Sequence, residues 1–459
     1  MAIGDKNSRY YYWLALEFVH KHSKLIFLSF LISVITAVSI VTISPYISST
    51  VLRHKKVIGI VGSYDAQSFD KLPDDILSKI SSSLTSVNDK GIVLPLLATT
   101  WEHSTDEKTY TFKMRKNVLL NNGKVFTAHN VLFKFLDVKM KVIDDYTLQF
   151  QLQKPLAIFP LYLTKPIVVY PYIGVAGLYS VEKVRTNNHL FKEIILSPNR
   201  KDVEPITYVF FPNEGEMITA YKLSKINEMS ITNRTMANAF MSWSNSAVTK
   251  YVSYDKLLTL FYNSKNPIIK ERDFRNAVES SIIYNSFKDI GEIASSPIPP
   301  ISWAYNTSLN KRETDIEFAK KTFKRMVTSD ATDSAKYTLL TYYDYLDMAD
   351  TISSNLRDAG LPIEVTFSSY SSKPEFDFML AYLTIPQDPD QYYYWHSTQN
   401  FAKLIDYTNL KVDKLLETGR STYKIADRKE SYIDLQKTLS DDPPALFLFY
   451  PYSYTVRRK

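Results

Sequence analysis

The chain has 459 residues, of which 45% are hydrophobic and 22% are charged. Single hydrophobic cores stop growing at roughly 250–300 residues, so this length predicts more than one globular lobe. The composition is typical of folded protein and excludes a largely disordered chain. The absence of cysteine excludes disulfides, thiolate metal sites, cysteine nucleophiles and a lipid-bearing cysteine anchor.

The net charge of +7 is concentrated near the N-terminus. Residues 1–56 contain seven basic and two acidic side chains, whereas the other 403 residues contain 48 basic and 46 acidic ones. The basic excess therefore flanks an apolar segment and does not form a phosphate-binding face. The sequence predicts no nucleic-acid partner.

That apolar segment is an uncharged run of nineteen residues, 25–43. As a helix it would span about 28 Å, close to the roughly 30 Å hydrocarbon core of a bilayer. It predicts a single transmembrane anchor over residues 25–45, ended by Pro45, with residues 1–24 in the cytoplasm. The alternative is a signal peptide cleaved near Ala37, but the apolar run continues past that point and a long segment precedes it.

The remainder mixes strand and helix patterns along its whole length, without repeats or Gly/Ser-rich linkers. Residues 109–114 and 146–152 alternate apolar and polar side chains, which predicts half-buried strands. Apolar residues recur at helical spacing in four later segments. These predicted helices cover residues 273–287, 346–359, 411–418 and 427–440. The pattern predicts an α/β fold.

No motif in the sequence supports catalysis. The seven histidines form no HExxH pair, and no phosphate-binding or nucleophile-elbow motif is present. The pairs Asp144–Asp145 and Asp388/Asp390 have no partnering residues for acid–base chemistry and predict turns. The sequence therefore predicts no enzyme, no metal site and no cofactor.

An ordered set of features in residues 95–135 resembles a hallmark of the bacterial extracellular solute-binding proteins of family 5. The features are Pro95, Trp101–Glu102, the strand Tyr110–Phe112, Arg115–Lys116, Gly123 and Phe126–Ala128 before a predicted helix. Other segments resemble the family in the same order, and the likeness covers roughly residues 57–455. Those segments are 145–155, 174–184, 261–282, 297–306, 388–397 and 412–452.

The resemblance implies a bilobal fold of the periplasmic-binding-protein type II kind, with a hinge between the lobes. Lobe one would comprise residues 57–256 with 446–459, and lobe two residues 257–445. Because the family works outside the cytoplasmic membrane, the lobes would be extracytoplasmic. This orients the anchor, since the charges on its two flanks are nearly balanced.

The function implied by the resemblance is capture of an oligopeptide or a similar organic solute for the permease subunits of an ABC-type importer. The alternative is a membrane-anchored sensor or adaptor on the same scaffold. In that case the aromatic run Tyr10–Trp13 would be its partner surface, although such residues also anchor helices at membrane interfaces.

The resemblance also implies a set of ligand-binding residues in lobe two. Tyr382 occupies the position of an aromatic side chain that lines the cleft, with core packing as the alternative. The Asp-Pro-Asp segment is expected at the site, with a structural turn as the alternative. The full set is Trp303, Tyr382, Thr384, Ile385, Asp388 and Asp390.

Two departures from the family pattern affect these expectations. Ile385 stands where peptide-binding members have an aspartate that pairs with the α-ammonium of the peptide. Because burying an unpaired cation is costly, the ligand would lack a free amino terminus, or another acid would replace the aspartate. In addition, the predicted helix after Ala128 reaches Asp144 within a short stretch, so the small subdomain of lobe one is expected to be trimmed.

Overall fold

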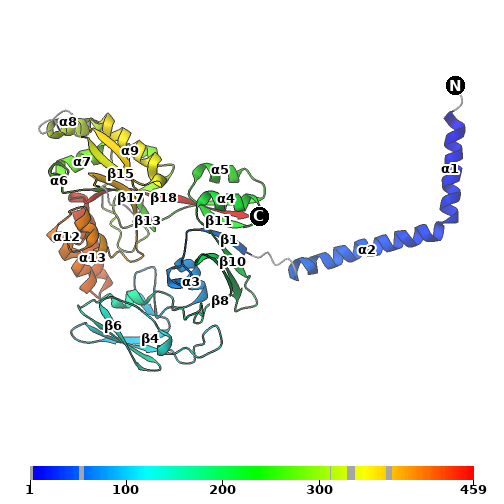
Figure 1. Ribbon diagram of the computed structural model, residues 1–459, viewed down its shortest axis with the longest axis horizontal. Coiled ribbons are helices and arrows are strands. Elements are labelled where there is room, and N and C mark those ends of the chain that lie inside the picture. Colours follow the sequence, from blue (N-terminus) through cyan, green and yellow to red (C-terminus); the bar gives the residue numbers. More distant parts are fainter. Residues whose placement is uncertain (1–3, 51–55, 311, 328–335, 369–374) are drawn as a thin grey trace.

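The computed structural model describes residues 4–50, 56–310, 312–327, 336–368 and 375–459. Two helices, α1 (Gly4–Lys21) and α2 (Ser23–Thr50), precede a globular α/β body (Figure 1). Helix α2 continues through Pro45, so the prediction that Pro45 ends this helix is wrong. A proline removes one N–H donor and crowds the preceding turn, yet this helix continues for five residues beyond it, to Thr50.

The two N-terminal helices meet at a sharp bend. Within the described residues, no single helix has the length and apolar content needed to cross a membrane. The segments Tyr10–Lys21 and Ser23–Ser39 meet those criteria together, with a bend of 74° between them. Large apolar side chains on this pair are exposed, Phe27 at 67% for example, so the globular body does not cover them.

A twelve-stranded sheet extends through much of the globular body, and β4 and β6 lie apart from it (Figure 1). Its main path has the order β16-β15-β17-β13-β18-β11-β1-β10-β9-β8, and β12 and β14 also pair with β18. The strands are β1 (Lys56–Val61), β8 (Tyr179–Asn187), β9 (Leu190–Pro198), β10 (Ile206–Phe211), β11 (Glu228–Ile231), β12 (Ser246–Val252), β13 (Lys256–Tyr262), β14 (Gly291–Ile293), β15 (Tyr337–Thr341), β16 (Ile363–Phe367), β17 (Phe378–Thr384) and β18 (Ala445–Arg458).

Strand β18 joins the two halves of this sheet. Its first part, Ala445–Pro451, pairs with β13 and β14, and its second part, Tyr452–Arg458, pairs with β11 and β12. We define lobe one as the elements from β1 to β12 together with the second part of β18. Lobe two consists of the elements from β13 to α13 together with the first part of β18. The chain thus passes between the lobes at residues 252–256 and within β18.

Lobe one also contains a smaller sheet with the order β4-β5-β7-β6. The predicted strands at 109–114 and 146–152 are confirmed as β5 and β7. Their inward side chains, including Tyr110, Phe112 and Phe150, are fully buried. The strands of the small sheets are β2 (Thr85–Val87), β3 (Val93–Pro95), β4 (Ala98–His103), β5 (Thr109–Met114), β6 (Val138–Asp144) and β7 (Thr147–Leu152).

The helix predicted after Ala128 is absent. A single 3₁₀ turn, Ala128–Asn130, takes its place, and Val131 is already extended. The Asn130 side chain accepts a hydrogen bond from the Thr127 N–H at 2.9 Å, which caps this turn. Only seven residues separate this turn from β6, and the chain connects the two in extended form.

Helices cover both faces of the lobe-two sheet (Figure 1). On β13, Leu258 and Leu260 pack toward α7 and α9, whereas Leu257 and Phe261 pack toward α12 and α13. A strand buried on both faces explains why residues 257–262 are almost continuously apolar. The four predicted helices of this lobe are confirmed, with the first ending early at Ser281. The helices of the two lobes are α3 (Asp74–Ile80), α4 (Glu214–Lys222), α5 (Arg234–Met241), α6 (Pro267–Lys270), α7 (Arg272–Ser281), α8 (Ile316–Val327), α9 (Leu346–Asp358), α10 (Tyr392–Trp395), α11 (Asn400–Leu404), α12 (Leu410–Ser421) and α13 (Ile425–Asp441).

Candidate ligand-binding site

The Asp-Pro-Asp segment forms a tight turn between β17 and α10. The Asp390 N–H donates to Asp388 Oδ1 at 3.1 Å, and the Tyr392 N–H donates to Asp390 Oδ1 at 3.1 Å. Aspartate favours such turns because its side chain accepts from the backbone two residues further on. The turn directs both carboxylates toward α12 and α13, where each meets an arginine.

Asp388 pairs with Arg428 of α13. Arg428 Nη2 lies 2.7 Å from Asp388 Oδ1, and both side chains are almost completely buried. Burial raises the pKa of Asp388, and the guanidinium of Arg428 counteracts this effect. Asp388 Oδ2 is buried and has no hydrogen-bond partner among the described residues. The site therefore holds one unused carboxylate oxygen.

Asp390 pairs with Arg420 of α12 and also meets lobe one. Arg420 Nε donates to Asp390 Oδ2 at 2.9 Å, and the Tyr162 hydroxyl donates to the same oxygen at 3.1 Å. Burial alone would lower the pKa of Arg420, but the Asp390 carboxylate outweighs it and raises this pKa. Because Tyr162 belongs to the 3₁₀ segment Phe159–Leu163 of lobe one, this cluster connects the two lobes.

The Arg420 guanidinium is also enclosed by aromatic rings. Its central carbon lies 3.8 Å from the ring centre of Tyr392 and 4.7 Å from that of Tyr393. Such cation–π contacts add to the ion pair when the cation is shielded from water. Arg420 Nη2 donates in addition to the Tyr162 hydroxyl oxygen at 3.2 Å. The arginine is thus held in one orientation between the lobes.

A second contact between the lobes involves the loop after α12. The hydroxyl groups of Tyr110 in β5 and Tyr423 share a hydrogen bond of 2.9 Å. The ring of His103 in β4 stacks on Tyr423, with centres 4.8 Å apart and an angle of 16°. The small sheet of lobe one therefore packs against the α12–α13 end of lobe two.

Trp303 forms a third contact between the lobes. A Cβ atom at Gly91 of lobe one would lie only 2.2 Å from Trp303 Nε1, so the indole packs directly on this glycine. Arg428 lies 5.2 Å from the Trp303 ring centre, which links the tryptophan to the Asp388 pair. Trp303 and Asp388 therefore both lie against Arg428, and Asp390 follows Asp388 in the same turn.

The other three expected residues lie on or just after β17. Tyr382 packs edge-on against Tyr345 at 5.1 Å, and burial raises its pKa to about 12. The Thr384 side chain is exposed, and its carbonyl accepts from the Tyr394 hydroxyl at 2.8 Å. Ile385 is only 7% exposed and lies in the core beside Leu383. The structure does not bring these three side chains to the Asp388–Asp390 turn.

The sequence reasoning missed Tyr162, Tyr423 and both arginines. For the arginines a signal existed, because each falls on the apolar face of its helix. Arg428 precedes the buried Tyr432 by four residues, and Arg420 follows the buried Leu416 by four. A charge in such a stripe predicts a buried partner. No local pattern marked the two tyrosines, since their partners lie hundreds of residues away.

The charges of the site balance one another. The two carboxylates meet two guanidinium groups, so the cluster as a whole is neutral. Among the described residues, no group of three or more His, Asp or Glu side chains is placed to hold a metal ion. The arrangement contains a buried carboxylate oxygen without a partner among the described residues, and aromatic side chains at the contact between the lobes.

The fold matches solved structures of two-lobed solute-binding proteins. One is NikZ from Campylobacter jejuni in complex with Ni(L-His), with a TM-score of 0.71, 20% identity, and coverage of 88% of this chain and 94% of that one. Another is the oligopeptide-binding protein AppA from Bacillus subtilis in complex with a nonapeptide, with a TM-score of 0.69, 20% identity, and coverage of 88% and 94%. The class is therefore that of the periplasmic-binding-protein type II-like fold.

Sequence comparison identifies the family. The family model described as "Bacterial extracellular solute-binding proteins, family 5 Middle" matches residues 93–139 and 135–403 of this chain. The chain is 24% identical to the oligopeptide-binding protein AppA of Bacillus subtilis (strain 168) over 473 residues, which is 86% of each chain. It is 22% identical to the di/tripeptide-binding protein 1 of Pseudomonas aeruginosa (strain UCBPP-PA14), over 80% of this chain and 82% of that one. The chain belongs to family 5 of the extracellular solute-binding proteins, which confirms the resemblance.

Proposed function

We propose that this protein captures an oligopeptide or a similar organic solute between its lobes and delivers it to the permease of an ABC-type importer. The observation that carries this proposal is the Tyr162–Asp390–Arg420 cluster, in which the Tyr162 hydroxyl of lobe one forms hydrogen bonds of 3.1 Å and 3.2 Å with Asp390 and Arg420 of lobe two. Polar groups that meet only when two lobes approach are suited to close a site around a ligand. Relatives named for peptide binding support the solute class.

The hinge would lie where the chain passes between the lobes. Residues 252–256 and the middle of β18 are the two connections, and short extended connections of this kind allow rotation with few broken contacts. We propose domain boundaries on this basis, with lobe one at 57–256 and 452–459 and lobe two at 257–451, so that the boundary in the last strand lies at 452 and not at the expected 446. The change of partners along β18, between Pro451 and Tyr452, supports a division within that strand.

For the ligand contacts, we propose Asp388, Asp390 and Trp303 as the central residues. The unpartnered Asp388 Oδ2 would accept from a donor group of the solute, which would satisfy a buried carboxylate oxygen. Tyr382, Thr384 and Ile385 remain proposed members at the edge of the site. Because Ile385 is apolar and buried, we propose that the solute is not held there by a free α-ammonium group.

We further propose that α2 anchors the protein in the cell membrane, with residues 1–24 in the cytoplasm and the lobes outside. The exposed apolar side chains of α2 support this arrangement, as does the finding that Ser23–Ser39 of α2 meets the length and apolar criteria for a membrane span together with Tyr10–Lys21 of α1. The 74° bend would place α1 along the membrane surface if α2 crosses it. Protease protection of the N-terminal segment in intact spheroplasts would test the orientation.

A ligand search on the full-length protein tests the function. We expect native mass spectrometry of gently purified protein to reveal a bound solute, and a peptide library to contain members that raise the melting temperature. Asp388→Asn should reduce this ligand-induced rise, whereas Asp427→Asn, a change of an exposed residue in α13, should not. Absence of a bound solute together with absence of any thermal shift would refute the proposal.

A sensor or adaptor on the same scaffold is the second candidate. It is favoured by the exposed aromatic residues Tyr10–Trp13 on α1, which are 63–69% exposed and available to a partner protein. Purification from membranes separates the two functions. Recovery of permease subunits supports the importer, and recovery of a signalling protein supports the sensor.

A further inference from the structure

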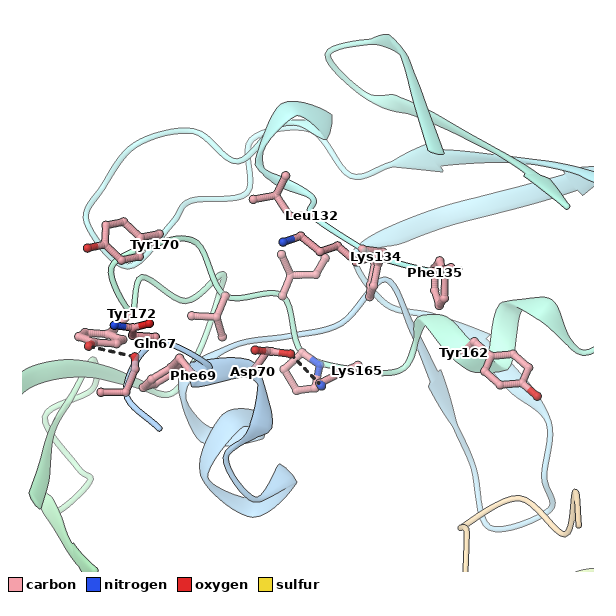
Figure 2. A pocket seen from close by; sticks show the side chains of 15 residues that line it. Gln67, Phe69, Asp70, Leu132, Lys134, Phe135, Tyr162, Lys165, Tyr170 and Tyr172 are labelled. Carbon is pink, nitrogen blue, oxygen red and sulfur yellow. Dashed lines mark hydrogen bonds and ion pairs between the residues drawn. The ribbon is translucent and has the colours of Figure 1, made fainter. Parts of the chain in front are cut away.

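A pocket of about 430 Å³ lies wholly within lobe one, apart from the Asp388–Asp390 turn. It is lined by the loop after β1, by the extended segment before β6, and by the residues that follow the 3₁₀ segment Phe159–Leu163 (Figure 2). Its volume falls within the range of about 300–1,000 Å³ that is usual for small-molecule sites. The pocket is therefore large enough for a compact organic ligand.

One side of this pocket is formed by extended chain where the sequence predicted a helix. In the extended segment 131–137, Phe133 and Phe135 pack toward the small sheet, and the ring centres of Phe135 and Phe159 are 5.9 Å apart. Leu132 and Lys134 alternate with Phe133 and Phe135 along the extended backbone, and all four side chains line the pocket (Figure 2). The sequence Leu-Phe-Lys-Phe thus contributes one ammonium group and two aromatic rings to the lining of the pocket.

The walls are mainly aromatic. Phe69 and Tyr172 contact each other with ring centres 4.7 Å apart, and the rings of Phe133 and Phe135 stack at 5.7 Å. At the rim, Tyr170 is 87% exposed and Leu132 is 70% exposed. Large apolar side chains that gather around a concavity and remain in water indicate a surface that gains free energy when it is covered. A flat apolar group would fit between these walls.

The charges of the lining favour an anion. Lys165 forms an exposed pair with Asp70 at 3.6 Å, which contributes little and leaves that lysine only loosely held. Lys134 forms no ion pair with any residue that the structure describes, and its ammonium points into the pocket opposite Asp70 and Lys165 (Figure 2). Two lysines thus face one aspartate, so the pocket has a net positive charge.

From this combination we infer that the lobe-one pocket binds a small organic anion with an aromatic body, its carboxylate directed to Lys134. The aromatic walls would stack on the ring, and the unpaired ammonium would supply a charge-assisted hydrogen bond. This site is separate from the proposed capture of a solute between the lobes. Tyr162 lines the pocket with its ring while its hydroxyl reaches Asp390 of lobe two, so the occupant would lie next to a residue that joins the lobes.

The test compares phenylacetate with its neutral counterpart phenylacetamide on the full-length protein in lipid nanodiscs, by calorimetric titration. A ligand of this size is expected to bind with a Kd of about 1 mM or tighter. We expect phenylacetate to bind about tenfold more tightly than the amide, because only the anion forms a charged hydrogen bond. Equal affinity for the two compounds, or no binding of either, would overturn the inference.

Variants of the lining locate the site. Lys134→Gln should weaken phenylacetate about tenfold and leave phenylacetamide unchanged, whereas the matched change Lys139→Gln on β6 should affect neither. Tyr170→Ala should weaken both compounds, because it removes a wall. All three residues are exposed, so folding should be unaffected, and thermal unfolding checks this. If Lys134→Gln and Lys139→Gln bind phenylacetate equally, the pocket is not the site. A peptide that stabilises wild type and Lys134→Gln alike would leave the interlobe proposal intact.

Discussion

The buried pair of Asp388 and Arg428 allows a sharp prediction about stability. Replacing Arg428 with Met puts an uncharged side chain of similar length in α13 and leaves the Asp388 carboxylate buried without its cation. Loss of one partner from a buried pair costs about 3–5 kcal/mol, and both side chains here are no more than 6% exposed. We expect Arg428→Met to lose this much free energy of unfolding at pH 7, which is a large part of the total stability of an ordinary domain.

The pH dependence of this loss follows from the protonation of Asp388. Burial already raises the pKa of Asp388 in the folded protein, and removing Arg428 removes a group that lowers it. The pKa in the folded variant therefore lies further above the unfolded value of about 3.9. The penalty is complete above the folded pKa and disappears as the pH falls toward the unfolded pKa, because the carboxyl group is then neutral in both states. The destabilisation should accordingly shrink between pH 7 and about pH 4.

Urea unfolding followed by tryptophan fluorescence measures this effect, since Trp303 lies beside Arg428. The exposed Lys429→Met in the same helix is the control and should change stability by less than about 0.5 kcal/mol. The double variant Arg428→Met with Asp388→Asn should recover much of the loss, because no buried charge remains unpaired. If Arg428→Met matches the control, or if its loss grows as the pH falls, the assignment of a buried charged pair is wrong.

Three further predictions concern the lobes. Tyr162→Phe should lower the free energy of unfolding by about 1–2 kcal/mol and increase the radius of gyration in X-ray scattering, because two hydrogen bonds between the lobes are lost; an unchanged radius would contradict this. Gly91→Ala should lower the free energy of unfolding by about 2–3 kcal/mol, whereas Gly123→Ala should lower it by roughly 1 kcal/mol. Both glycines have positive φ, but only Gly91 packs on Trp303. Equal urea midpoints for the two variants would contradict that contact. Ile385→Asp should cost about 3 kcal/mol or more and lower the melting temperature, since it buries an unpaired carboxylate; a wild-type melting temperature would show that position 385 is not core.

The sequence by itself determined the class of fold and most of the elements. Strands β5 and β7 and helices α7, α9, α12 and α13 follow from the spacing of apolar residues, which is a local property of the chain. The family could be recognised because its turns and strand ends occur in a fixed order. Where the local signal was weak, the prediction was wrong, as with the helix after Ala128 and the end of α2 at Pro45.

Only the tertiary structure decided how the site is assembled. The hydrogen bond from Tyr162 to Asp390 spans 228 residues and that between Tyr110 and Tyr423 spans 313, and no periodicity predicts contacts at such separations. Burial likewise depends on which face of a strand packs against helices, so Ile385 lies in the core and Thr384 in water. The sequence therefore determined which residues are available, and the packing of the two lobes decided which of them meet.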